Sequence, residues 1–455
     1  MSSETIDEKN KKEQKKNKEQ FILPEKKFEL RESLLTTLFE NPHIETIYHI
    51  FAVILIGLIV NTAAHDILKT GNAKLGIQIV LSGFSKIHIT AVIWVGEFLS
   101  SCLCYPCLFL WAKCRTHFSP KSGKLALWDS FWFFVVPVYY FCAFKISGQL
   151  VTDFQIPPAS AAIVIFEMVR MMMKVHAFIR ENASKVLRHK PHSDEPLNLP
   201  QFSTFMYYFF APTLIYRDEY PRTSHIRWGY VCTRAFEVLC IILNIGYLIE
   251  RLIKPSFQEF GLRTYTVTEI FLCICEMSFA GMLLKLYGFY FMLHSWSNLW
   301  AELLRFGDRK FYSSWWIATS YAEYFRTWNI LVGDWLYTYV YKDMYEVVVP
   351  RNKIAAKFAV FMLSAMVHEW LMCYMLGYFV PIMFIFFFFF SGPMSFIKAP
   401  KLSVLNILFW YGLAYGSGTM VCVYTMEFYA RANTPSEVLK MKDYFVPQMF
   451  KYITY

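Results

Sequence analysis

This 455-residue sequence contains few charged residues. Asp, Glu, Lys and Arg together make up only 18% of it. Soluble domains usually contain about 25% charged residues, so an ordinary soluble protein is excluded. The sequence is instead 56% hydrophobic and 19% aromatic. Several apolar runs reach the roughly 20 residues that a helix needs to cross a bilayer. These features predict an all-α, polytopic membrane protein.

The sequence also lacks a metal-binding pattern. Cys104 and Cys107 form a CxxC, but neither a second cysteine pair nor a histidine cluster follows at zinc spacing. His368 and Glu369 resemble the start of an HExxH zinc motif, yet Met372 stands where the second His is required. No metal site is therefore expected.

Internal repeats and soluble linkers of domain size are absent as well, which predicts one membrane domain, residues 41–435. Residues 1–40 are interpreted as a disordered, basic, cytosolic tail and a pre-membrane segment, and 436–455 as a short C-terminal segment. The first 20 residues are rich in Lys and Glu and cannot bury enough apolar surface to fold alone. Their lysines favour the cytosolic side. About nine spans are expected, near 45–65, 87–112, 126–145, 157–179, 229–250, 267–294, 353–376, 378–397 and 403–428.

The net charge of +10 fits a cytosolic face that meets anionic head groups or an anionic substrate. Nucleic acid is not expected as a partner, because the basic residues lack a soluble domain to present them.

Several of the predicted spans contain ionisable side chains, Lys285 among them. Glu167 and Arg170 lie three residues apart, as do Arg234 and Glu237, so each pair is predicted to form along its own helix. The spans must therefore enclose a polar interior.

Two stretches carry residues suited to chemistry. In the aromatic segment 306–343, Asn329 follows Trp328 and lies close to Arg326; an interfacial amphipathic helix would explain the aromatic residues alone. In "LSAMVHEWLM", Ser364 and His368 are four residues apart and share a helix face. A structural role is the usual one for a histidine in an apolar helix, and general base or proton relay is the chemical alternative. Glu369 points about 100° away from His368 and is interpreted as structural or orienting.

At these stretches the sequence resembles the membrane-bound O-acyltransferases, and within them the sterol O-acyltransferases. The resemblance covers roughly residues 125–435, so residues 41–435 are interpreted as a membrane-bound O-acyltransferase domain. Four stretches carry it in the family's order: "FAPTLIYRDEYPRTSHIRWGYV", "FYSSWWIATSYAEYFRTWNILVGDWLYTYVYKD", "LSAMVHEW" and "MEFYARANTP".

The resemblance implies a bundle of about nine transmembrane helices around an intramembrane reaction chamber. His368 matches the catalytic histidine, Asn329 the asparagine that pairs with it, and Trp328 a tryptophan of the chamber. The positions that line the acyl-CoA site are matched by Arg326, Tyr337, Tyr341, Lys353 and Ser364. The implied reaction is direct acyl transfer from a long-chain fatty acyl-CoA to the 3-hydroxyl of a sterol, which forms steryl ester for storage. Acyl-CoA is a co-substrate, and no cofactor is implied.

The implied setting is the endoplasmic reticulum membrane, with a cytosolic N-terminus and a homodimeric or homotetrameric assembly among membrane lipids. One motif departs from the family, because FYxDWWN reads "FYSSWWI", with Ser314 and Ile317 in place of Asp and Asn. Two alternatives stay open. The acceptor could be another lipid alcohol, such as diacylglycerol or a fatty alcohol, or the chain could be a catalytically impaired lipid-sensing protein of the same fold.

Overall fold

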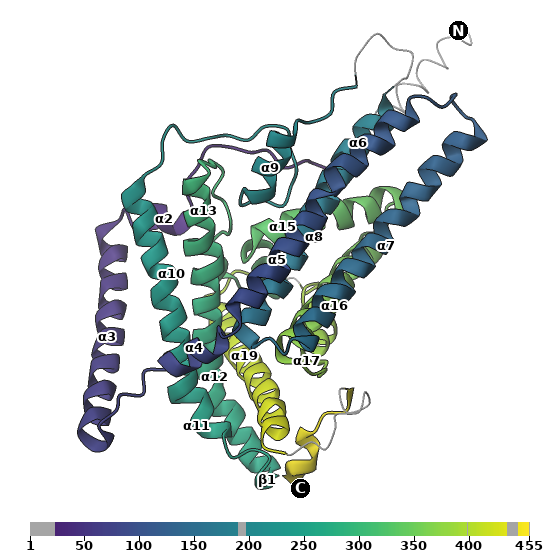
Figure 1. Cartoon of the computed structure of the whole chain (residues 1–455). Coiled ribbons are helices and arrows are strands. Elements are labelled where there is room, and N and C mark those ends of the chain that lie inside the picture. Colours follow the sequence, from purple (N-terminus) through teal and green to yellow (C-terminus); the bar gives the residue numbers. More distant parts are fainter. Residues whose placement is uncertain (1–22, 190–196, 398, 435–444, 455) are drawn as a thin grey trace.

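The structure is a computed structural model that describes residues 23–189, 197–397, 399–434 and 445–454. Figure 1 shows long helices that lie side by side in an elongated bundle. Within the described ranges the β structure named as strands consists of β1 (Tyr265–Thr266) and β2 (Ile453–Thr454), which pair in parallel with Tyr265 opposite Ile453. The predicted all-α class is confirmed. The first 22 residues, which hold most of the predicted tail, lie outside the described residues.

Six helical stretches among the described residues are long and apolar enough to cross a membrane. They are α3 (Pro42–Thr70), α5 with α6 (Ile87–Cys102, Cys104–Arg115), α7 (Gly123–Asp153), α12 with η2 and α13 (Val267–Phe289, Tyr290–Trp296, Ser297–Leu303), α16 (Lys353–Leu376) and α19 (Ser403–Ala432). The chain is a multi-pass membrane protein.

The other three predicted spans are also helical, but they differ from these six. Two are the long helices α8 (Pro158–Arg188) and α10 (Trp228–Leu248), each of which carries an ion pair along its own length. The third is a shorter apolar stretch made of α17 (Ile382–Ile385), η6 (Phe386–Ser391) and α18 (Gly392–Met394). By length and composition alone, six of the nine expected spans qualify, and the other three lie on α8, on α10 and on the shorter stretch α17 to α18.

The remaining helices are short and connect or cover the long ones. They are α2 (Leu34–Leu38), α4 (Ile77–Gly83), α9 (Phe202–Phe210), η1 (Ile249–Ile253), α11 (Lys254–Phe257), η3 (Trp315–Ile317), α14 (Tyr321–Thr327), α15 (Ile330–Leu336), η4 (Tyr337–Tyr341), η5 (Met344–Val348) and η7 (Met449–Tyr452). Of these, η1, η4 and η5 are π-helical, as are η2 and η6 in the stretches above. Short π-helical turns inside α-helices are frequent at functional sites.

Close helix packing holds the centre of the bundle, where α12 runs against α19. A Cβ atom added to Gly281 would lie 2.6 Å from the backbone nitrogen of Gly418. One added to Gly418 would lie 2.6 Å from the Cα atom of Ser278. Small residues let two backbones approach this closely, which is the usual way in which helices associate within a membrane.

Both ion pairs predicted within spans are confirmed. Glu167 Oε1 accepts from Nε of Arg170 at 2.6 Å, and Glu237 Oε1 lies 2.9 Å from Nη2 of Arg234. Trp94 also donates to Glu167, at 2.8 Å. These carboxylates satisfy the nearby guanidinium groups, which makes the charges tolerable among apolar helices.

The pre-membrane segment packs onto the membrane helices through a charge network. Arg31 forms an ion pair with Asp308 at 2.6 Å, and hydrogen bonding to that carboxylate raises the pKa of Arg31. Glu302 is fully buried and lies 2.7 Å from Nη1 of Arg309 and 2.8 Å from Nη2 of Arg227. The segment that precedes α2 is thereby fixed beside the loop after α13. The predicted domain boundaries remain predictions.

Candidate active site

His368 lies on α16, and a neighbour on the same face sets its tautomer. The backbone carbonyl oxygen of Ser364 is 2.7 Å from Nδ1 of His368, and the Ser364 hydroxyl oxygen is 3.4 Å from the same atom. A carbonyl oxygen can only accept a hydrogen bond, so Nδ1 carries the proton. The lone pair then lies on Nε2, which makes that nitrogen the proton acceptor of the ring. Both side chains are half-buried, so part of each remains uncovered by protein atoms.

The π-helical segment η6 holds the other side of this imidazole. The ring of Phe387 stacks on His368 with centroids 4.4 Å apart and planes 24° apart. Glu369, the next residue along α16, is buried and instead accepts a hydrogen bond from the backbone nitrogen of Phe384 at 2.9 Å. The two adjacent polar residues therefore have different partners, as their angular separation predicted. Glu369 joins α16 to α17, whereas His368 packs against Phe387 of η6.

Asn329 caps the start of α15. Its side-chain oxygen accepts a hydrogen bond from the backbone nitrogen of Val332 at 3.1 Å. The amide NH₂ group is thus the part of Asn329 that is left to donate. Among the described residues no hydrogen bond joins Asn329 to His368. The helix that precedes Asn329 does reach the His368 side of the site, because the ring centroid of Phe325 on α14 lies 5.7 Å from that of Phe387, which stacks on His368.

Trp328 belongs to a cluster of rings that packs between α12 and α14. Its ring centroid lies 4.6 Å from that of Trp315, 5.3 Å from that of Tyr324 and 5.3 Å from that of Phe289. Aromatic pairs at these separations stabilise a defined arrangement by about 0.5–1.5 kcal/mol each beyond the area they bury. Asn329, which follows Trp328 directly, is consequently held in a fixed position.

Two of the predicted acyl-CoA residues, Arg326 and Tyr337, line one hollow of about 350 Å³. The pre-membrane segment contributes to the same hollow, whose lining residues are Pro24, Glu25, Lys26, Arg31, Lys310, Arg326, Ile330, Asp334, Tyr337 and Thr338. Lys26 is neutralised by Asp334 at 2.6 Å. Among the described residues no carboxylate lies within ion-pair distance of the side chains of Lys310 and Arg326, so both are available to an anion.

Tyr337 and Tyr341 stack on each other along η4, with ring centroids 5.7 Å apart and planes 14° apart. Burial raises the pKa of both hydroxyls, so at neutral pH they are hydrogen-bond donors. Lys353 is exposed in the first turn of α16, and no contact among the described residues joins it to Arg326 or Tyr337. The structure thus brings together Ser364 with His368, Tyr337 with Tyr341, and Arg326 with Tyr337.

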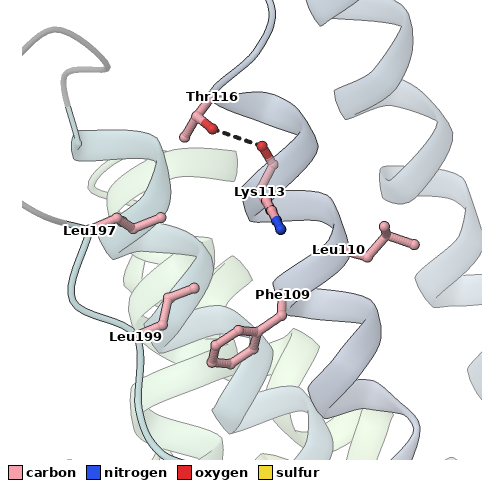
Figure 2. Close-up of a pocket in the computed structure, with 6 residues that line it drawn as sticks. All are labelled: Phe109, Leu110, Lys113, Thr116, Leu197 and Leu199. Atoms are coloured by element: carbon pink, nitrogen blue, oxygen red, sulfur yellow. Dashed lines mark hydrogen bonds between the residues drawn. The ribbon is translucent and has the colours of Figure 1, made fainter.

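A second hollow, of about 340 Å³, contains none of the predicted site residues. Figure 2 shows it beside the end of α6, lined by Phe109, Leu110, Lys113, Thr116, Leu197 and Leu199. The Thr116 hydroxyl donates to the Lys113 carbonyl oxygen at 2.7 Å, which closes the helix end.

Three residues of this region were missed as site residues. Phe387 lies in a run of phenylalanines that reads only as an apolar span. Lys310 directly precedes the "FYSSWWI" stretch, but only the fold brings it to the hollow that Arg326 lines. The sequence alone marks Lys285 as unusual, because a lysine in an apolar run is rare. Its position near Trp328, however, depends on the packing of α12.

Comparisons with known proteins bear on the family of the chain. The family model described as "MBOAT, membrane-bound O-acyltransferase family" matches residues 109–426. The chain is 39% identical over 420 residues to sterol O-acyltransferase 1 of Cricetulus griseus, a match that covers 92% of this chain and 77% of that protein. It is 38% identical over 426 residues to sterol O-acyltransferase 1 of Mus musculus, with the same coverage. It is 36% identical over 414 residues to sterol O-acyltransferase 2 of Homo sapiens, covering 90% and 77% of the two chains.

Proposed function

The chain belongs to the membrane-bound O-acyltransferase family, and we propose that it transfers a long-chain fatty acyl group from acyl-CoA to the 3-hydroxyl of a sterol. The product is a steryl ester for storage. Support comes from the sterol O-acyltransferases that match 90% or more of the chain. The observation that carries the chemistry is the hydrogen bond between Nδ1 of His368 and the Ser364 carbonyl oxygen.

That hydrogen bond prepares His368 to act as a general base. With Nδ1–H donating to the carbonyl, the lone pair of Nε2 is free to take the proton of the sterol hydroxyl. Stacking on Phe387 holds the imidazole plane in place.

In the proposed step the sterol oxygen attacks the thioester carbonyl carbon while His368 accepts the hydroxyl proton. The C–S bond then breaks, and the imidazolium returns the proton to the departing thiolate of coenzyme A. Asn329 steadies the thioester or its oxyanion with its amide NH₂ group, because its amide oxygen is occupied by Val332. The step needs neither a metal nor a covalent acyl-enzyme.

The hollow beside Arg326 is the proposed site for the phosphates of coenzyme A. Arg326 and Lys310 provide positive charge there, and Tyr337 adds a neutral donor. Tyr341 extends the site along η4, and Ser364 lies deeper, next to His368. Lys353 is exposed at the start of α16 and would contact only a part of the acyl-CoA that lies outside the protein.

The position of the pre-membrane segment indicates on which side of the membrane the N-terminus lies. Pro24, Glu25 and Lys26 line the same hollow as Arg326, so the pre-membrane segment and the phosphates lie on one side of the molecule. Because acyl-CoA is a charged, cytosolic compound, the N-terminus is then cytosolic as well. The proposed setting is the endoplasmic reticulum membrane, where the chain forms a homodimer or homotetramer and takes the sterol from the bilayer.

The proposal is tested by separating and identifying the labelled products of the reaction. The purified protein is supplied with radiolabelled oleoyl-CoA together with cholesterol, diacylglycerol or a long-chain alcohol, each in the same lipid. Steryl ester as the main labelled product is the expected result. Label that appears only in triacylglycerol or wax ester would assign the chain to another lipid alcohol. Binding of oleoyl-CoA without any ester would contradict acyl transfer and favour a lipid sensor.

The altered "FYSSWWI" motif is the reason to keep the sensor as a second candidate. Ile317 is 60% exposed, and the Ser314 side chain makes no cap hydrogen bond with the short helix that follows. Neither residue contacts His368 among the described contacts. We therefore expect the double change Ser314→Asp and Ile317→Asn to alter steryl ester formation by less than about twofold. A tenfold increase in steryl ester formation would mean that the altered motif impairs catalysis in the wild type.

A further inference from the structure

Most cations buried among the long helices have a partner of their own. Arg115 pairs with Asp129, Arg170 with Glu167, and Arg234 with Glu237. Lys174 is instead satisfied by backbone, because its ammonium group donates to the carbonyl oxygens of Tyr208 and Ala211, each at 2.6 Å. Lys285 on α12 differs from all four. Among the described residues it has no carboxylate within ion-pair distance and no hydrogen bond.

The contacts of Lys285 are aromatic and place it at the proposed reaction centre. Its Nζ atom lies 4.8 Å from the ring centroid of Trp328 and 5.3 Å from that of Tyr324. Trp328 directly precedes Asn329, the residue proposed to steady the thioester. Lys285 is half-buried, so part of its side chain is not covered by protein atoms.

These contacts do not fully compensate the charge. A lone ammonium inside a membrane is costly to keep charged. The two aromatic faces return only part of that cost to a half-buried ammonium. A negative charge that develops beside Lys285 would therefore offset the uncompensated part of its charge.

Acyl transfer produces such a charge on the thioester oxygen. We propose that Lys285 is a catalytic residue whose ammonium group donates a hydrogen bond to the thioester carbonyl oxygen and stabilises the oxyanion formed there. This inference rests on the proposed acyl transfer. As the sterol oxygen bonds to the carbonyl carbon, the π electrons move onto the carbonyl oxygen beside Lys285. They return when the C–S bond breaks, and Lys285 keeps its proton throughout.

Kinetics of Lys285→Met test this role, because methionine is similar in length and uncharged. Loss of one oxyanion donor typically lowers kcat by about 10²–10³-fold, and we expect about 100-fold here. The KM for oleoyl-CoA should change by less than about threefold, because the ground-state carbonyl carries little charge. Lys285→Arg should restore part of the rate. Lys145→Met, which removes an exposed cation from α7, is the matched control and should match the wild type.

Ligand binding separates this role from a structural one. The first ligand is S-hexadecyl-CoA, which has no carbonyl; the second is a CoA analogue with an anionic phosphonate in place of the thioester carbonyl. In the wild type the phosphonate should bind more tightly, and in Lys285→Met its advantage should fall about tenfold or more while the thioether binds equally well. A merely structural role would weaken both ligands together.

The outcomes separate this inference from the proposed function. Wild-type protein that makes no ester contradicts the proposed function itself. Wild-type esterification together with unchanged kcat and unchanged phosphonate preference in Lys285→Met would overturn only the role of Lys285. If the methionine variant does not fold, Lys285→Gln, which keeps a weaker neutral donor, takes its place with the same expected directions.

Discussion

Arg326 offers a quantitative test of the proposed coenzyme A site. It lines the hollow of about 350 Å³ together with Lys310, and no carboxylate among the described residues neutralises it. A hydrogen bond to a charged group contributes about 1.5–3 kcal/mol when desolvated. Arg326 is exposed, so solvent screening reduces its share to about 1 kcal/mol. Arg326→Met should therefore raise the KM for oleoyl-CoA about fivefold at low salt.

Two features of the assay make this result specific for phosphate. The effect should shrink in 1 M salt, where the screening length falls to about 3 Å. It should vanish with oleoyl-pantetheine, which keeps the thioester but has no phosphate. Arg263→Met is the matched control, since Arg263 is exposed just before β1, which lies at the bottom of Figure 1, away from α15. An equal KM increase with oleoyl-CoA and oleoyl-pantetheine would refute the contact between Arg326 and a phosphate.

Three further predictions concern the catalytic face and the stability of the bundle. Ser364→Ala should lower kcat less than about threefold, because the backbone carbonyl rather than the hydroxyl holds His368 at 2.7 Å; steady-state rates check this, and a loss above 100-fold would contradict it. Arg309→Met should destabilise the protein by about 3–5 kcal/mol, because it leaves fully buried Glu302 short of one partner; thermal unfolding in detergent measures this, and an unchanged Tm would contradict it. Gly281→Val should abolish folding or separate α12 from α19, since its Cβ would lie 2.6 Å from backbone; a normal gel-filtration profile with normal activity would refute that packing.

The helical class was predictable because it depends on composition and on the length of apolar runs. The ion pair of Glu167 with Arg170 and the shared face of Ser364 and His368 followed from the period of the α-helix alone. The number of spans was harder to predict, because run length alone does not distinguish a simple span from a helix such as α8 that carries its own charges.

Contacts between distant segments could not be read from the sequence. The hollow at Arg326 includes Lys26 and Lys310, which only tertiary packing brings together. The stacking of Phe387 on His368 depends on the π-helical turn η6, and a run of five phenylalanines gives no sign of which ring turns inward. The roles assigned to His368 and Asn329 came from a resemblance and stay predictions until they are measured.

The most direct test of the central claim is steryl ester formation by wild type and His368→Ala with labelled oleoyl-CoA and cholesterol, measured beside oleoyl-CoA binding. General-base catalysis typically contributes about 10²–10⁴-fold, so His368→Ala should lose that much turnover while it still binds oleoyl-CoA. Full turnover by His368→Ala would contradict the account.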